Sequence, residues 1–162
     1  MNIPPESQNM ILKPCPGQFV INELPRLFLC ILGLVYGGIE GSPLALPVLS
    51  VSLVLVLLLS YRYIYLRHIR YIIGEEQLVC ENGIFHRSVN YMELYRIVDF
   101  YEHQTLLQQL FSLKSVIIYS MDRQTPRLEL QGLSNTSEVV SIIRERVEYN
   151  KQKRCVYEIT NR

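Results

Sequence analysis

The sequence predicts a membrane-anchored α+β protein in which a two-helix transmembrane hairpin precedes an antiparallel β domain with a C-terminal helix. Three observations predict this class. Residues 41–61 carry no charge, a second apolar stretch lies just upstream, and from residue 67 onward short β-prone segments lead to one amphipathic helix. Charged residues make up only 19% of the chain, against about 25% in average soluble domains. The formal net charge of +1 argues against a nucleic-acid partner.

The uncharged run over residues 41–61 predicts a membrane span. A helix of these 21 residues would reach ~31 Å at ~1.5 Å per residue, which matches the hydrocarbon core of a bilayer. We place this span at about residues 43–65. A buried core helix or strand is the alternative interpretation.

A first span is predicted over about residues 22–39. Its uncharged part, residues 27–39, has 13 residues and would reach only ~20 Å, so the span has to include Glu23 and Arg26. These two side chains are three positions apart and can pair on a helix near the membrane interface. A re-entrant or interfacial segment is the alternative.

Local signals predict how the two helices begin and turn. Asn22 can cap the first helix with Pro25 in its first turn, and Pro47 lies one turn into the second helix, where it can bend it slightly. The Gly- and Pro-containing residues 37–43 predict a tight turn. The whole hairpin is expected within residues 19–66, after a polar, Pro-rich cytoplasmic tail over residues 1–18.

Basic residues predict the orientation of the hairpin. Lys13 and Arg26 precede or open the spans, Arg62, Arg67 and Arg70 follow them, and the turn has no Lys or Arg. The positive-inside rule then places both termini in the cytoplasm, with three tyrosines in residues 61–65 forming an aromatic belt. The three following arginines are also candidates for contact with anionic lipid, at ~1 kcal/mol each, although they can equally serve topology alone.

The soluble part is predicted over residues 67–153, followed by a tail over residues 154–162. Asn82-Gly83 is the strongest hairpin signal in the chain, and residues 105–111 suggest a short helix. The expected strands cover residues 69–73, 77–81, 84–88, 89–102 with a break near residue 92, 115–122 and 127–133.

An amphipathic helix is expected over about residues 136–151. Val139, Ile143 and Val147 recur at helical spacing with charged residues between them, and Asn135 to Glu138 offer a cap. A sheet of hairpins has edges that need covering, so we expect a small partial barrel or sandwich with this helix over one opening.

The sequence gives no pattern for an enzyme, cofactor or metal site. No phosphate loop, dinucleotide fingerprint or nucleophile elbow is present, and Glu75-Glu76 is typical of a solvated turn. No two cysteines are close enough in sequence for zinc-type spacing, and cytoplasmic thiols stay reduced. Cys80 and His86 flank one hairpin and could approach across it. The cysteines are Cys15, Cys30, Cys80 and Cys155, and the histidines are His68, His86 and His103.

The order of motifs resembles the bacterial pleckstrin-homology-like (PH-like) membrane proteins. The motifs that carry this resemblance are Asn82-Gly83-Ile84-Phe85, Tyr95-Arg96-Ile97-Val98-Asp99, Leu106 to Phe111, Val116-Ile117-Ile118 and Leu128 to Leu133. Members commonly have glycine after the Leu-Phe pair, where this chain has Ser112.

The resemblance covers roughly residues 68–148 and the hairpin before them. It implies a bent sheet of seven strands capped by a helix, anchored in the bacterial inner membrane and without catalytic residues. The expected function is protein–protein interaction or assembly with a partner or a second copy. Lipid headgroup sensing, or a role as an accessory subunit of a transport or envelope complex, is the alternative. Arg96 can contact a partner or form an ion pair with Asp99 or Glu93.

Overall fold

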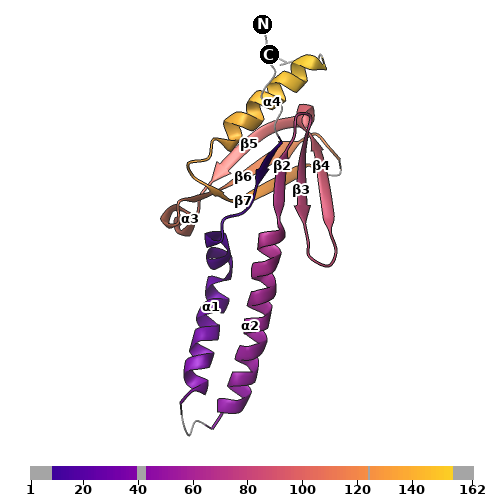
Figure 1. The fold of residues 1–162 in the computed structure, drawn as a ribbon. Coiled ribbons are helices and arrows are strands. Elements are labelled where there is room, and N and C mark those ends of the chain that lie inside the picture. The colour runs from indigo at the N-terminus through magenta and orange to yellow at the C-terminus, as the bar shows by residue number, and fades with distance from the viewer. Residues whose placement is uncertain (1–8, 40–42, 124, 155–162) are drawn as a thin grey trace.

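A pair of long helices projects from a β domain, and a further helix lies at the far end of that domain (Figure 1). The structure is a computed structural model that describes residues 9–39, 43–123 and 125–154. In chain order the elements are β1 (Met10–Leu12), α1 (Gly17–Gly37), α2 (Ala45–His68), β2 (Arg70–Ile73), β3 (Gln77–Asn82), β4 (Ser88–Glu93), the 3-10 helix η1 (Leu94–Arg96), β5 (Ile97–His103), α3 (Leu106–Leu110), β6 (Leu113–Ser120), β7 (Arg127–Ser134) and α4 (Val139–Lys153).

The strands form two antiparallel sheets, and the α+β prediction is confirmed. One sheet has the order β1-β2-β3-β4 and the other the order β5-β6-β7. The break between β4 and β5 occurs at η1, where the chain passes from one sheet to the other. The expected single bent sheet of seven strands is therefore wrong: the described strands make two separate sheets and no closed barrel, because η1 interrupts the pairing between β4 and β5.

One expected strand is largely a loop, and one observed strand was not expected. Residues 83–87 form a loop rather than part of a strand, so the chain after Asn82-Gly83 re-enters the sheet only at Ser88. The strand that completes the described seven is β1, which falls in the segment predicted as a tail. Its register pairs Met10 with Ile73 and Leu12 with Tyr71. A three-residue strand has almost no periodicity of its own, and its partner lies beyond both long helices.

The beginnings of the helices also differ from the prediction. α1 starts at Gly17, five residues before the predicted cap, and Pro25 lies inside it. Asn22 accepts a hydrogen bond from Gln18 Nε2 at 2.8 Å instead of capping the helix. α2 starts at Ala45, so Pro47 falls in its first turn, where a missing N–H removes no helical hydrogen bond. The predicted turn includes residues 40–42, which lie outside the described residues.

α1 and α2 pack closely along a stripe of small residues. A Cβ on Gly33 would lie 2.2 Å from Ser52 Oγ, and a Cβ on Gly37 would lie 2.5 Å from Leu49. Small residues four positions apart allow two helix backbones to approach in this way. Away from this contact most large apolar side chains of both helices are exposed. By length and composition, both helices could cross a membrane.

One apolar core fills the space between the two sheets. Its members come from both sheets and from α4, which contributes Val139, Ile143 and Val147. α4 begins at Val139, slightly later than predicted, and its apolar positions are those of the predicted pattern. The buried Arg146 ties this helix to the sheet, since its Nη1 donates to Ile73 O at 2.8 Å and to Gly74 O at 2.9 Å.

The turn after α3 depends on a strained residue. Thr105 and Gln108 form a capping box at the start of α3, and Ser112 follows the end of the helix with φ +52°. This is the left-handed region, which glycine enters with the least strain. The position at which the resembled family commonly has glycine thus keeps a glycine-like conformation, and serine occupies it here.

Ser112→Gly should therefore stabilise the protein by about 0.5–1 kcal/mol, because it relieves left-handed strain. Ser88→Gly is the matched control. Ser88 begins a strand, and glycine there should destabilise by a similar amount. Urea unfolding of the purified proteins measures both changes, and equal effects of the two substitutions would contradict the role assigned to φ at Ser112.

Candidate interaction site

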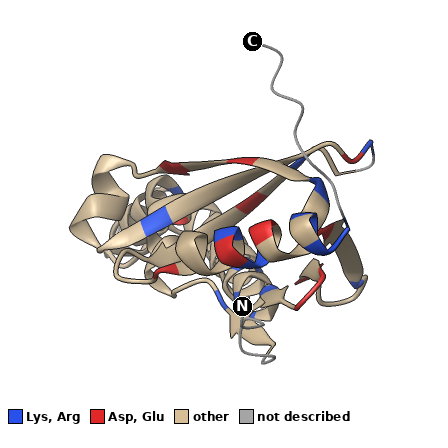
Figure 2. Cartoon of the chain, turned by 90° about the horizontal axis from the view of Figure 1, so that it is seen from above, with Lys and Arg blue, Asp and Glu red and all other residues tan. Residues whose placement is uncertain are grey.

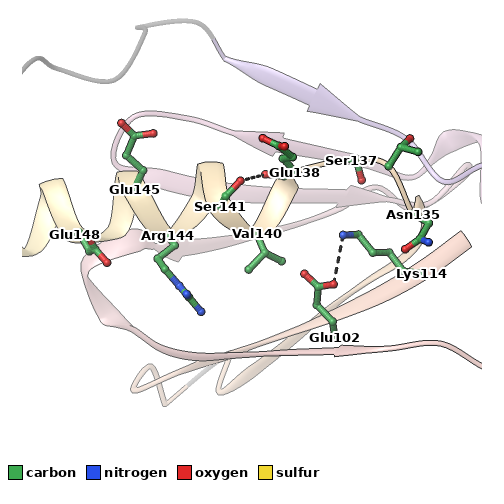
Figure 3. A pocket seen from close by; sticks show the side chains of 11 residues that line it. Glu102, Lys114, Asn135, Ser137, Glu138, Val140, Ser141, Arg144, Glu145 and Glu148 are labelled. Carbon is green, nitrogen blue, oxygen red and sulfur yellow. Dashed lines mark hydrogen bonds and ion pairs between the residues drawn. The ribbon is translucent and has the colours of Figure 1, made fainter.

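A groove of about 630 Å³ runs between α4 and the paired strands β5 and β6. Its floor and walls come from one side of α4, from the loop before that helix, and from Glu102 on β5 and Lys114 on β6 (Figure 3). α4 packs mainly on η1, and its contacts with β5 are sparse. The groove lies where helix and strand diverge.

The side chains of the groove carry more negative than positive charge. Lys114 is nearly buried, and its Nζ lies 3.3 Å from Glu102 Oε2, so this pair neutralises itself. Arg144 lies over the ring of Phe100, with 5.9 Å between the guanidinium carbon and the ring centroid. Three further glutamates of α4 and the residue before it line the groove: Glu138, Glu145 and Glu148. Figure 2 shows acidic and basic positions side by side on α4.

One wall of the groove belongs to a strand with an open edge. Among the described strands β5 pairs only with β6, so its other edge has backbone groups without a strand partner. The pairing shifts register between Ile97 and Asp99, which bends the strand. An open edge beside a groove can accept an extended chain segment through main-chain hydrogen bonds.

A second feature lies where the helix pair meets the β domain. Glu23 on α1 has a side chain only 5% exposed, and it pairs with Arg26 one turn further along the helix. Arg62 of α2 approaches from the neighbouring helix, with its Nη1 3.2 Å from Glu23 Oε1. The predicted Glu23–Arg26 pair is therefore present, and the structure adds Arg62 to it. The carboxylate joins the two helices.

A buried amide network joins α1 to the β domain. Gln108 Nε2 on α3 lies 3.0 Å from Gln18 Oε1 and 2.8 Å from Ser115 Oγ on β6. Gly132 on β7 leaves room for Gln18, because a Cβ there would lie 2.8 Å from Gln18 Cβ. Such satisfied buried networks fix one arrangement of the elements they join.

The three arginines predicted to contact lipid occupy different surroundings. Arg62 is committed to Glu23, and Arg67 lies on Tyr63, with its Nη1 3.4 Å from the tyrosine hydroxyl. Arg70 is exposed and lines a cavity of about 250 Å³ together with His68, Glu81 and Arg87. The structure therefore does not gather the three into one cluster.

Arg96 and Asp99 do not pair with each other. Arg96 Nε lies 3.1 Å from Glu93 Oε2, and Arg96 Nη1 lies 3.7 Å from Asp122 Oδ2. The Asp99 carboxylate instead accepts a hydrogen bond from the backbone N–H of Phe100 at 2.7 Å. The bulge between Ile97 and Asp99 accounts for the separation, since it changes the direction of the chain between the two side chains.

The cysteines and histidines are dispersed. Cys80 is buried in the core opposite Asn90, while His86 lies exposed in the β3–β4 loop, so the hairpin does not bring the two together. Burial raises the pKa of the Cys80 thiol. Within residues 9–39, 43–123 and 125–154, no group of three or more His, Cys, Asp or Glu side chains is placed to hold a metal ion. Cys155 lies outside these residues.

The remaining pKa shifts have structural causes. Burial is the main reason that the pKa of Tyr71 rises to about 12, although the backbone N–H of Gln131 donates to its hydroxyl at 3.3 Å. This hydrogen bond joins β2 to β7 and thereby links the two sheets. On the surface, the hydrogen bond between Lys153 and Glu76 lowers the pKa of the glutamate and raises that of the lysine.

Sequence reasoning missed the groove, the amide network and the contribution of Arg62. Arg62 and Glu23 are far apart in sequence, and nothing local marks Gln18 or Gln108 as partners. The close helix contact did have a readable signal, because Gly33 and Gly37 have the G-x-x-x-G spacing of packed helices.

Comparison with known families agrees with this architecture. The family model described as bacterial PH domain matches residues 27–147, which include part of α1, all of α2, the strands β2 to β7 and the first part of α4. The chain therefore belongs to the bacterial PH domain family, and the resemblance inferred from the motifs is confirmed. No curated protein and no solved structure gives a match.

The shared carboxylate predicts non-additive mutations. Arg26→Ala or Arg62→Ala alone leaves one arginine on Glu23 and should cost less than about 1 kcal/mol. The double variant leaves a buried carboxylate unpaired and should cost about 3 kcal/mol. Unfolding of the detergent-purified protein measures all three variants.

Adding Glu23→Gln to the double variant should recover most of that loss, since a neutral amide is easier to bury than an unpaired carboxylate. Arg62→Ala combined with Arg67→Ala is the control, and those two effects should add. Additive effects of Arg26→Ala and Arg62→Ala would show that Glu23 does not couple them.

Proposed function

We propose that this chain is a non-enzymatic, membrane-anchored PH-like module that presents a protein-binding groove at the cytoplasmic face of the bacterial inner membrane. The observation that carries the proposal is the position of the exposed apolar helix pair. In the sequence, α1 and α2 connect β1 to β2, two neighbouring strands of one sheet. Most of the large apolar side chains of the two helices face outward. A surface of this size needs an apolar environment, and a bilayer supplies one.

The proposed orientation rests on charge. The basic residues all lie on the side of the helix pair nearer the β domain: Lys13 and Arg26 before and within α1, Arg62 and Arg67 within the last turns of α2, and Arg70 just after it. This end of the helix pair belongs in the cytoplasm by the positive-inside rule. The β domain and both termini are then cytoplasmic. Tyr61, Tyr63 and Tyr65 lie at the level of the inner interface.

The topology can be tested with single-cysteine variants. The four native cysteines are first replaced by serine or alanine, and Ser42→Cys or Ser88→Cys is then introduced. With a membrane-impermeant thiol reagent on intact cells, we expect Ser42→Cys to be labelled and Ser88→Cys to react only after lysis. The reverse pattern would place the β domain outside, and absence of labelling at both sites would favour a re-entrant first segment.

The chemistry of the groove supports an extended, basic segment as the bound partner. The open edge of β5 offers main-chain pairing, and the glutamates of α4 offer charge complementarity to lysine or arginine. The segment can belong to another protein, such as a subunit of a transport or envelope complex, or to a second copy of this chain. The mass of a cross-linked product distinguishes these cases.

A photocross-linking residue in place of Ser141, which is exposed and lines the groove, tests this proposal in cells. We expect a discrete product that Glu145→Lys reduces at least fivefold. Glu75→Lys is the matched control, because it makes the same charge change at an exposed turn outside the groove. No product, or equal loss with both substitutions, would contradict binding in the groove.

A further inference from the structure

Phe85 is exposed to an unusual degree for a phenylalanine. It lies in the β3–β4 loop and is 91% exposed, although burying such a ring is worth roughly 1.5–3 kcal/mol. Its ring stacks on that of Tyr61 of α2, with centroids 6.4 Å apart and an angle of 9° between the planes. Figure 1 shows the β3–β4 hairpin reaching down beside α2, beyond the rest of the β domain.

The contact with Tyr61 places Phe85 at a defined height along the helix pair. Tyr61 is the last residue of the uncharged run 41–61, and Arg62 follows it. Leu57 and Leu58, one turn earlier, are exposed and belong to the apolar surface of the helix pair. Phe85 therefore continues this apolar surface at its upper boundary.

α3 provides a second apolar projection. Leu106 is 84% exposed and Leu110 79% exposed, while the Gln108–Gln18 hydrogen bond holds the short helix against the first turn of α1. In Figure 1, α3 and the β3–β4 hairpin lie on opposite sides of the helix pair. The two projections thus flank the point where the helices enter the β domain.

Basic side chains lie close to the β3–β4 loop that carries Phe85. His68, Arg70 and Arg87 line the cavity beside the β3–β4 loop, and Glu81 is the one acidic residue among the described residues that line it. Glu81 pairs with Arg87 at 2.7 Å, which leaves Arg70 as positive charge facing the cavity. An apolar tip with a cation close to it is typical of segments that bind at a lipid interface.

We propose that the β3–β4 loop and α3 rest in the inner interface of the bilayer that holds the helix pair. Phe85 lies at the level of the upper acyl chains, Arg70 faces the lipid phosphates, and the leucines of α3 make a shallower contact on the other side. This inference rests on the proposed anchoring of α1 and α2. It adds that the β domain itself binds lipid and has a fixed orientation on the membrane.

The chain has no tryptophan, so single-tryptophan variants report depth directly. The variants are Leu57→Trp, Phe85→Trp, Leu106→Trp and Met121→Trp, each in the full-length chain reconstituted into liposomes with lipids brominated at shallow or deep acyl positions. Met121 is 76% exposed and lies beside η1, on which α4 packs away from the helix pair, so it serves as the aqueous control.

We expect deep bromines to quench Leu57→Trp, and shallow bromines to quench Phe85→Trp at least twofold with a blue-shifted emission. Leu106→Trp should be quenched less than Phe85→Trp, and Met121→Trp should stay unquenched. If Leu57→Trp is quenched while Phe85→Trp is quenched no more than Met121→Trp, the proposed lipid contact of the β domain is wrong and the proposed anchoring by α1 and α2 stands. If Leu57→Trp is not quenched, the anchoring itself is wrong.

Discussion

β1 and β2 pair side by side although both long helices lie between them in the sequence, and this pairing constrains the rest of the molecule. It places the beginning of α1 and the end of α2 against one sheet edge. Glu23 then joins the two helices to each other, and Gln18 joins α1 to α3 and β6. Because both helices are attached to the domain, the helix pair and the β domain act as one unit rather than as a domain on a flexible tether.

The features that sequence alone predicted correctly are those with local signals. Long uncharged runs marked both helices, Asn82-Gly83 marked the β3–β4 connection, and the spacing of Val139, Ile143 and Val147 marked the face that α4 buries. The motif order identified the family. Even Ser112, where the chain departs from the family pattern, keeps the backbone conformation that the turn requires.

The features that could not be predicted depend on residues distant in sequence. β1 is too short to show a pattern, and only its register with β2 defines it as a strand. The sequence placed Arg62 near a membrane but gave no sign of its contact with Glu23. Arg96 has two carboxylates within three residues, Glu93 and Asp99, and only the bulge in β5 shows that Asp99 is not its partner. The groove forms because α4 and β5 lie at an angle to each other, and the sequence of neither segment alone predicts that angle.

Because the helix pair lies between β1 and β2 in the sequence, it also determines when the four-stranded sheet can form during biosynthesis. β1 emerges from the ribosome before either helix, and β2 emerges after both. The four-stranded sheet therefore cannot be completed until α1 and α2 have been synthesised and have formed their hairpin. Close packing of α1 on α2 lowers the entropic cost of that closure, because it brings the two ends of a long connection together. A chain whose helices fail to pair would keep an open β2 edge, which is a feature that promotes aggregation. Completion of the sheet is thus coupled to correct assembly of the helices.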